Sequence, residues 1–362
     1  MTLLEKAGAV NAHTHLYSGL VPFDLPFQIP PTLPFPDILK TLWWRLDRAL
    51  TPDILSAAAR YYVGQALLYG TTTLVDHHES PTMIAGSLDI LASACADLGI
   101  RAVLCYGVTE RNFGREEAQA GLAECQRFLQ TRPTGKIRGA VGVHAGFTVS
   151  DQTLTDAGNL ARQFQVPVHI HAAEDTCDVD DARRRGDAGL LARFIRTRAL
   201  SEGSILAHGV HLTNDEVREC DRLGMWLVNN PRSNENNRVG YAAALAKSRR
   251  VALGTDGFPS DMEAEKTCLA EQIKGADGIV VNPEVRLAAG RQIVRQIFGE
   301  KVLLSDRVIM RESPEGREVT AVEIGGERVV ENGSLVYATW QSLVADAKRA
   351  AHVLWARMED VQ

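Results

Sequence analysis

The chain has 362 residues, of which 45% are hydrophobic and 23% are charged, and its formal net charge is −6. This balance is typical of a globular protein with a large core, and the negative charge without basic runs argues against a nucleic-acid partner. No window approaches the roughly 20 apolar residues of a membrane span, and the N-terminus has no apolar signal core. We therefore expect a cytoplasmic protein that does not associate with membranes.

The cysteines are scattered along the chain and include no C-x-x-C pair. This spacing predicts reduced thiols, and neither a disulfide framework nor a zinc knuckle. The six positions are Cys95, Cys105, Cys125, Cys177, Cys220 and Cys268.

Short apolar strands alternate with longer helical segments along most of the chain. Residues 9–11 open the first strand, and a proline-rich segment, 21–36, follows it. The length of that segment indicates a functional loop over a site. Helices are expected at 36–46, between the N-cap Thr51 and Gly70, at 83–98, at 115–130, after Ser150, at 181–198 and after the capping box Thr213–Glu216. The other strands are expected at 71–75, 101–106, 137–143, 166–170, 204–207, 225–228 and 250–253.

Eight strands, each followed by a helix or a long loop, predict an α/β protein with a (β/α)8 TIM barrel. The strands are continuous apolar runs, as in parallel sheets covered on both faces. The tail differs, with helices at 261–268 and 283–298, short strands between 307 and 336, and a helix at 341–357. We expect three units: the barrel at 1–300, a small, reduced β-sandwich appendage at 301–340, and a C-terminal helix at 341–362.

His13 and His15 follow the first strand at a spacing that places both side chains on one face. Alone, the pair is equally compatible with a surface loop. Two imidazoles cannot saturate a metal ion, because zinc takes about four ligands and a catalytic zinc keeps one position for water. Other candidate ligands lie at strand ends, where barrels build their active sites. His171 after the fifth strand and Asp256 after the eighth strand complete the predicted set.

A metal held by three histidines and an aspartate lowers the pKa of its water towards neutrality. Asp256 can accept the proton of that water, and Glu174 can carry a proton to a leaving group or a ring nitrogen. His208, after the sixth strand, can orient the water or stabilise an oxyanion. The competing interpretations are a core or helix-capping histidine at 208 and a plain Asp-Gly turn at 256.

His78 and His144, at the ends of the second and fourth strands, are candidate substrate contacts. Asn234 either bonds to the substrate or only shapes the turn after the seventh strand. His169 lies on the same strand face as His171 but one pleat deeper. This position favours a histidine that supports a metal-binding side chain, or one that only packs in the core, over a histidine that binds the metal itself. Six aromatic residues either stack on a flat ring or pack within loops: Tyr17, Phe23, Phe27, Phe35, Phe147 and Phe258.

Together, these residues resemble the amidohydrolase superfamily, and within it the amino- and chlorohydrolases that act on heteroaromatic rings. The similarity covers about residues 8–300. The matching motifs are His13-Thr14-His15, the H-x-x-E of His171 and Glu174, Ala207-His208-Gly209, Gly254-Thr255-Asp256 and the segment 230–240. The stretches around His15, His78, His144 and Asn237 are most similar to aminohydrolases of the SsnA type.

The resemblance implies one divalent metal, usually zinc with iron(II) as an alternative, held by the four predicted ligands. It implies proton transfer by Glu174 and Asp256, assisted by His208. The implied reaction is hydrolytic deamination of a purine-, pterin- or pyrimidine-like small molecule with loss of ammonia. The alternatives are hydrolysis of a C–Cl or amide C–N bond at the same site, or metal binding without catalysis.

Two features depart from parts of the superfamily. His144, and no lysine, ends the fourth strand, which disfavours the branch with two metals and a carbamylated lysine. Members also carry more β-structure before the first strand, so we expect the β-sandwich to come from the C-terminal segment alone. A homodimer is compatible with the sequence.

Overall fold

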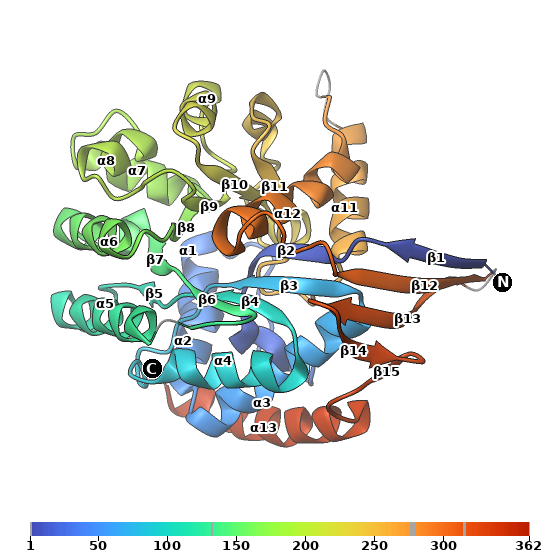
Figure 1. Cartoon of the computed structure of the whole chain (residues 1–362). Helices are drawn as coiled ribbons and strands as arrows, with labels where there is room; N and C mark the ends of the chain where they lie inside the picture. The colour runs from blue at the N-terminus through green and yellow to red at the C-terminus, as the bar shows by residue number, and fades with distance from the viewer. Residues whose placement is uncertain (1, 132, 276–279, 314–315, 362) are drawn as a thin grey trace.

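The computed structural model describes residues 2–131, 133–275, 280–313 and 316–361. Parallel strands surround a central core, and helices cover them on the outside (Figure 1). The barrel strands are β2 (Ala9–Thr14), β3 (Thr71–Asp76), β4 (Arg101–Leu104), β5 (Gly107–Val108), β6 (Ile137–Gly139), β7 (Val141–Ala145), β8 (Val168–Ala172), β9 (Ile205–His208), β10 (Trp226–Asn229) and β11 (Val251–Leu253). Two of the eight barrel strands are interrupted: β4 and β5 together form one of them, and β6 and β7 together form another.

Two sheets make up the barrel wall, with strand orders β2-β3-β4-β6 and β5-β7-β8-β9-β10-β11. They join where β4 continues into β5 and β6 into β7. At the other seam, the backbone of Thr14 bridges that of Asp256. There the carbonyl of His13 accepts hydrogen bonds from the backbone nitrogens of Thr255 and Asp256 at 2.9 and 3.0 Å. The predicted (β/α)8 barrel is therefore confirmed, and its closing seam runs through two predicted metal ligands.

Side-chain caps begin several helices where the sequence predicts them. Thr51 and Ser150 accept hydrogen bonds from backbone nitrogens of the first turn, and Thr213 forms the expected capping box. The helices are α1 (Phe35–Ile38), α2 (Trp44–Ala49), α3 (Pro52–Leu68), α4 (Ser87–Leu98), α5 (Arg115–Gln130), α6 (Asp151–Phe164), α7 (Thr176–Arg184), α8 (Leu190–Arg196), α9 (Asn214–Arg222), α10 (Pro231–Asn236), α11 (Met262–Lys274), α12 (Pro283–Phe298) and α13 (Trp340–Asp360).

The single helix expected at 181–198 is wrong. Asp175 caps a helix that begins earlier, at Thr176, and the chain breaks after Arg184 before α8 starts at Leu190. Gly186 lies in the break with a φ of 92°, a left-handed conformation that favours glycine. The start of the helix expected at 83–98 was also too early, because α4 begins at Ser87.

Helix α12 closes the end of the barrel opposite the predicted site. Its residues Ala289 and Ile293 pack on barrel side chains such as Val75 and Val228, and Figure 1 shows it lying across the middle of the barrel. Gly290 allows this approach, since a Cβ there would lie 3.0 Å from Cβ of Val10. With this end sealed by apolar packing, substrate can reach the barrel only at the C-terminal ends of the strands.

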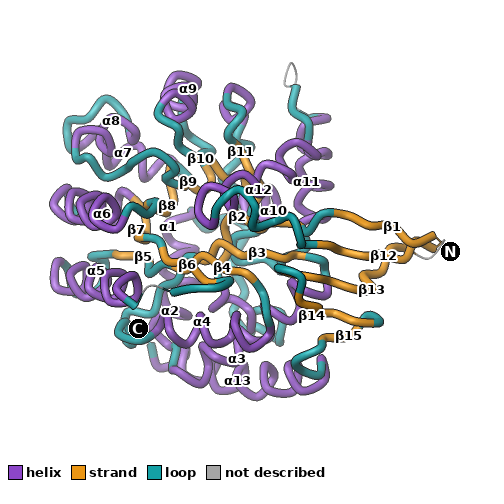
Figure 2. Tube along the Cα trace, in the orientation of Figure 1, coloured by secondary structure: helices purple, strands orange, loops and turns teal. Residues whose placement is uncertain are grey.

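An antiparallel sheet projects beside the barrel (Figure 2). Its strand order is β1-β12-β13-β14-β15, with bounds β1 (Thr2–Lys6), β12 (Arg307–Ser313), β13 (Gly316–Ile324), β14 (Glu327–Glu331) and β15 (Ser334–Leu335). Asn332 and Gly333 have φ of 50° and 73°, as a type I′ hairpin turn requires. The expectation that only the C-terminal segment builds this sheet is wrong, because β1 pairs with β12. The division at residues 300 and 340 stays a prediction.

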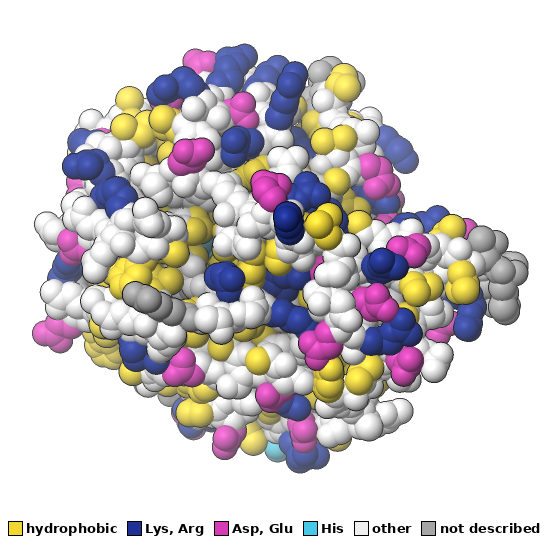
Figure 3. Space-filling view, viewed as in Figure 1, with side chains coloured by type: hydrophobic (Ala, Val, Ile, Leu, Met, Phe, Trp, Pro, Cys, Tyr) yellow, Lys and Arg dark blue, Asp and Glu magenta, His cyan; other side chains and the backbone are white. Residues whose placement is uncertain are grey.

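Lysine and arginine side chains are interspersed with aspartate and glutamate on the face shown in Figure 3, where the antiparallel sheet protrudes from the rounded body. Helix α13 packs along α3, and its Trp355 donates a hydrogen bond to the carbonyl of Phe23 at 2.7 Å. That bond anchors the start of the proline-rich segment. None of the helices in the described part of the chain is long and apolar enough to cross a membrane.

Candidate metal centre and catalytic cavity

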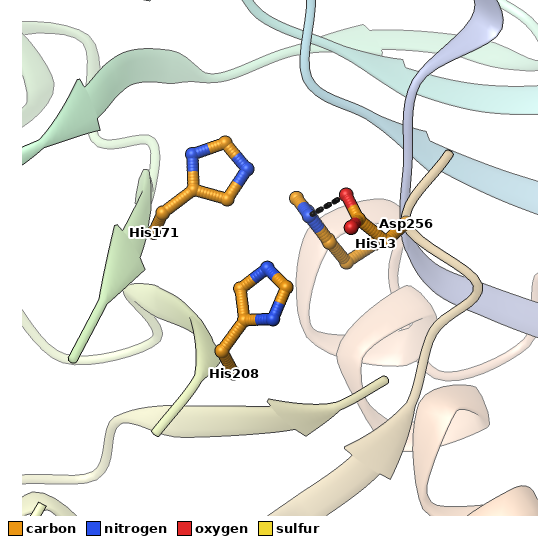
Figure 4. A group of neighbouring side chains, drawn as sticks. All are labelled: His13, His171, His208 and Asp256. Atoms are coloured by element: carbon orange, nitrogen blue, oxygen red, sulfur yellow. Dashed lines mark ion pairs between the residues drawn. The ribbon is translucent and has the colours of Figure 1, made fainter. Parts of the chain in front are cut away.

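Four side chains from the C-terminal ends of different strands converge (Figure 4). They are His13, His171, His208 and Asp256, and their ligand atoms lie within 4.8 Å of one another. Nε2 of His15 adjoins them, 2.9 Å from Oδ1 of Asp256 and 3.2 Å from Nε2 of His171. The structure therefore brings together all four predicted ligands and adds His208 to them.

Backbone carbonyls decide which ring nitrogen of His15 and His171 carries a proton. Nδ1 of His15 lies 2.5 Å from the carbonyl oxygen of His77, and Nδ1 of His171 lies 2.6 Å from that of His144. A carbonyl only accepts, so both Nδ1 atoms donate, and each Nε2 atom points at the centre, where it can hold a metal ion once it carries no proton. Ring nitrogens this close to one another and to a carboxylate repel unless a proton or a metal ion lies among them. This donor set fits a divalent metal ion.

His13 and His208 also direct their Nε2 atoms at the centre. Nε2 of each ring is buried without a hydrogen-bond partner. Nδ1 of His208 lies 2.8 Å from Oδ1 of Asn234, and Nδ1 of His13 lies 2.9 Å from Nε2 of His169. His169 thus supports a ligand, as the sequence favoured. Asn234 holds His208 in place and does not line the cavity beside the centre. Its position therefore gives no support to the predicted hydrogen bond between Asn234 and the substrate.

The candidate ligand histidines differ in their affinity for protons. Burial lowers the pKa of His13 to about 3, so this ring is neutral and available as a ligand. Burial would also lower the pKa of His15, but Asp256 and Glu79 raise it to about 9. Below that pH, a proton occupies Nε2 of His15 until a cation replaces it, so metal binding there releases a proton.

The two predicted catalytic carboxyl groups have pKa values shifted in opposite directions. Burial raises the pKa of Glu174 to about 7. Burial would also raise that of Asp256, but its close contacts with the imidazoles of His13 and His15 hold its pKa well below the usual range. At neutral pH, Asp256 is therefore ionised while Glu174 can gain or lose a proton. Such a split is typical of a pair that divides acid and base roles.

Three residues of the centre or next to it have a backbone conformation that non-glycine residues rarely adopt. Ala173, His208 and Asp256 have φ of 50°, 75° and 53°; Ala173 follows β8, His208 ends β9, and Asp256 lies three residues after β11. A left-handed residue turns the chain sharply, which aims His208 and Asp256 inward and starts the turn that carries Glu174. The cost of such conformations is about 1–3 kcal/mol each, and they concentrate at functional sites.

Sequence reasoning missed two residues after the second barrel strand, His77 and Glu79. Nδ1 of His77 lies 2.8 Å from Oε1 of Glu79, while its Nε2 donates to the carbonyl of Val143 at 3.0 Å. A proton therefore lies between His77 and Glu79. Burial would raise the pKa of Glu79, but the contact with His77 keeps it low. Glu79 is 1% exposed and lines the cavity beside the centre.

His78, which the sequence predicted as a substrate contact, lies away from the cavity beside the centre. Its Nε2 lies 2.8 Å from Oγ of Ser80, and the ring is fully buried and does not line the cavity. The polar run Asp76-His77-His78-Glu79 after the second barrel strand was the sequence signal from which His77 and Glu79 could have been predicted. Strand alternation could not choose between its histidines, because β3 ends at Asp76.

We expect Gly107→Ala to destabilise the protein by about 1–3 kcal/mol, the usual cost of overpacking. A Cβ at this position would lie 2.4 Å from Oε1 of Glu79 and 2.5 Å from Cε1 of His77. Gly275→Ala is the matched control, since its Cβ would meet only ordinary contacts, the nearest at 3.7 Å. Urea unfolding followed by circular dichroism measures both changes. Equal stability of the two variants would contradict this packing of Glu79.

The cavity beside the centre is small, about 60 Å³. His144 lines it, with Nδ1 3.0 Å from Oγ1 of Thr148, so its predicted role in substrate binding stays a prediction with a suitable position. Three of the predicted aromatic residues also line this cavity: Tyr17, Phe35 and Phe147. The lining further includes Glu174, Arg111, Trp43 and Trp44.

Comparison with known proteins identifies the family of this chain. Residues 6–295 match the model of the amidohydrolase family. The chain therefore belongs to the amidohydrolase family.

Among curated relatives, a 5'-deoxyadenosine deaminase of Methanocaldococcus jannaschii is 28% identical over 292 residues, which cover 77% of this chain and 65% of that protein. An 8-oxoguanine deaminase of Pseudomonas aeruginosa is 27% identical, covering 81% of this chain and 70% of that protein. The chain thus spans about two thirds of the length of these relatives.

Solved structures show the same fold. An adenosine deaminase from Xanthomonas campestris with bound zinc superposes with a TM-score of 0.83 at 22% identity, over 97% of this chain and 86% of that one. An atrazine chlorohydrolase from Arthrobacter aurescens complexed with zinc gives a TM-score of 0.72 at 19% identity, over 96% and 88%.

Proposed function

We propose that this chain is a metal-dependent aminohydrolase that removes an amino group from a purine-like ring. One observation carries the proposal: buried imidazole lone pairs and the ionised Asp256 converge beside Glu174, a carboxyl group with a pKa of about 7. The relatives named as deaminases of 5'-deoxyadenosine and 8-oxoguanine support the class of substrate.

We also propose that His13, His15, His171 and Asp256 hold the ion, with His208 as a neighbouring acceptor. A nitrogen-rich set with one carboxylate suits zinc, and iron(II) is the alternative. A divalent ion bound there acts as a Lewis acid that makes water a nucleophile near neutral pH. The free cysteines of the described chain agree with the reduced thiols of a cytoplasmic enzyme.

The protein's own groups manage the protons of the reaction. Asp256, ionised at neutral pH, accepts a proton from the attacking water. Glu174, held by a hydrogen bond from Nδ2 of Asn237 at 3.1 Å, delivers a proton to the ring nitrogen next to the reacting carbon. His208 donates through Nδ1 to Asn234 and so presents an acceptor at Nε2, 3.5 Å from Oε2 of Glu174. Water adds to the carbon, Asp256 passes the accepted proton to the amino group, the C–N bond breaks as the hydroxyl proton returns to Glu174, and ammonia leaves.

Ammonia release from a panel of heterocycles tests the proposal. The panel holds adenosine, 5′-methylthioadenosine, 8-oxoguanine, a pterin and cytosine, with a chlorotriazine as the rival substrate. The zinc-loaded protein should release ammonia from at least one purine, and chelation of the metal should stop the release. Chloride release from the triazine without any deamination would favour the chlorohydrolase alternative and overturn the proposal.

A further inference from the structure

A second, larger cavity adjoins the catalytic cavity. We call it the side chamber; its volume is about 390 Å³. It shares four lining residues with the catalytic cavity: Trp43, Asn237, Asp256 and Gly257. Because Asp256 belongs to the metal centre, any molecule that reacts there lies next to the opening of the side chamber.

The sizes of the two cavities decide where a substrate must lie. At about 10–15 Å³ for each water position, the catalytic cavity holds roughly four to six water molecules. That space suits the reacting edge of a ring together with water. The remainder of a substituted bicyclic substrate needs the larger space, and the side chamber is the adjoining cavity that provides it.

The proline-rich segment forms the outer wall of the side chamber. Val21, Leu25, Phe27 and Ile29 are half-buried and line it, whereas the alternate residues between them are exposed. Ile38, Leu42 and Phe258 extend the apolar lining. The proline-rich segment, whose length predicted a functional loop, thus presents one apolar face to the side chamber.

The polar groups at the border of the side chamber already have partners. Oγ of Ser233 donates to Oδ2 of Asp256, and Nδ2 of Asn237 donates to Oε1 of Glu174. The guanidinium of Arg238 donates to the carbonyl oxygens of Pro30 and Pro31, which ties the proline-rich segment to the end of α10. An occupant would therefore meet mostly apolar side chains, and the guanidinium of Arg238, which carbonyl oxygens do not neutralise, is exposed at the border.

Trp43 stands between the two cavities. It ends a π-helical turn, Leu39–Trp43, an element often found at functional sites. Its indole packs on Gly257, where a Cβ would lie 3.2 Å from Cη2 of the tryptophan. The indole is thus placed beside the residue that follows Asp256, where a ring entering the catalytic cavity would pass.

We propose that the side chamber binds an uncharged, mostly apolar substituent of the ring substrate, such as an alkyl or thioalkyl end, while the ring reacts beyond Trp43. This inference rests on the proposed function, because the metal centre sets the position of the ring. It narrows the substrate to a purine-like compound whose far end is apolar, and it disfavours one that ends in a zwitterion.

Three compounds that share adenosine and differ at the 5′ end test the inference. They are 5′-methylthioadenosine, adenosine and S-adenosylhomocysteine, with an apolar, a hydroxyl and a zwitterionic end. We expect the zinc-loaded protein to bind the methylthio compound at least tenfold more tightly than either of the others, measured by calorimetry. Ammonia release gives kcat/KM for the same series.

Ile29→Lys places a charge inside the side chamber, and Gln28→Lys places the same charge on the exposed side of the same segment. We expect the first change to lower the preference for 5′-methylthioadenosine over adenosine at least tenfold. The second change should leave it within twofold.

Equal affinity for the three compounds, or tighter binding of the zwitterion, overturns the side-chamber inference even if deamination is fast. An equal effect of the two lysine variants also overturns it. Tight, Ile29-dependent binding of the methylthio compound without ammonia release would keep the inference and refute the proposed deamination.

Discussion

Asp256→Asn is expected to lower kcat/KM for ring deamination by about 10³–10⁴-fold. The carboxylate does two things that an amide cannot do equally well. Its Oδ1 lies 2.9 Å from Nε2 of His15 and 3.4 Å from Nε2 of His13, where it supplies the negative charge of the ligand set. It is also the ionised acceptor for the proton of the attacking water. Ammonia release, together with metal content per chain, measures the effect.

Asp24→Asn is the matched control for this change. Asp24 is exposed, and like Asp256 it is an aspartate with a positive φ, 53° at both positions. The control variant should keep wild-type activity and metal content. Both variants should unfold cooperatively, because asparagine has nearly the size and shape of aspartate and leaves the core packing unchanged. Wild-type turnover by a folded Asp256→Asn protein would contradict the assigned role.

Glu174→Gln is expected to lower kcat by about 10²–10⁴-fold, the usual contribution of a positioned acid or base. Glutamine keeps the size of the side chain and can keep the contact with Asn237, but it cannot deliver a proton to the ring. In the wild type, kcat/KM should fall as pH rises through about 7, since the protonated form of Glu174 is then lost. A variant with unchanged kcat would assign the proton transfer to another group.

The same variant should be more stable than the wild type at alkaline pH when both are metal-free. Burial raises the pKa of Glu174 in the folded state to about 7, above its value in the unfolded chain. The group therefore adds stability below about pH 4.5, and this stability is lost as pH rises through 7. At pH 8 the buried carboxylate costs about 3 kcal/mol relative to its protonated form.

Urea unfolding of the metal-free proteins at pH 5 and pH 8 measures this difference. The exposed Glu271 offers a control, and Glu271→Gln should change stability equally at both pH values. A Glu174→Gln protein that gains no stability over the wild type between pH 5 and pH 8 would show that Glu174 is not a buried carboxyl group of raised pKa.

The sequence by itself determined the barrel and predicted most of the residues that gather at the candidate centre, because the signals involved are local. Strand alternation and the C-terminal ends of apolar runs identified His13, His15, His171 and Asp256, and the spacing after His171 identified Glu174. Helix caps at Thr51, Ser150 and Thr213 depend on contacts within one turn, and all three are found as expected.

Only the tertiary structure decided the features that depend on residues far apart in the chain. It paired β1 with β12, and it turned His77 rather than His78 towards the centre. It also oriented the ligand rings, because the carbonyls that accept from His15 and His171 belong to neighbouring strands. The side chamber likewise needs the proline-rich segment folded against α10. Such contacts leave no periodic pattern in the sequence, since packing across the barrel establishes them.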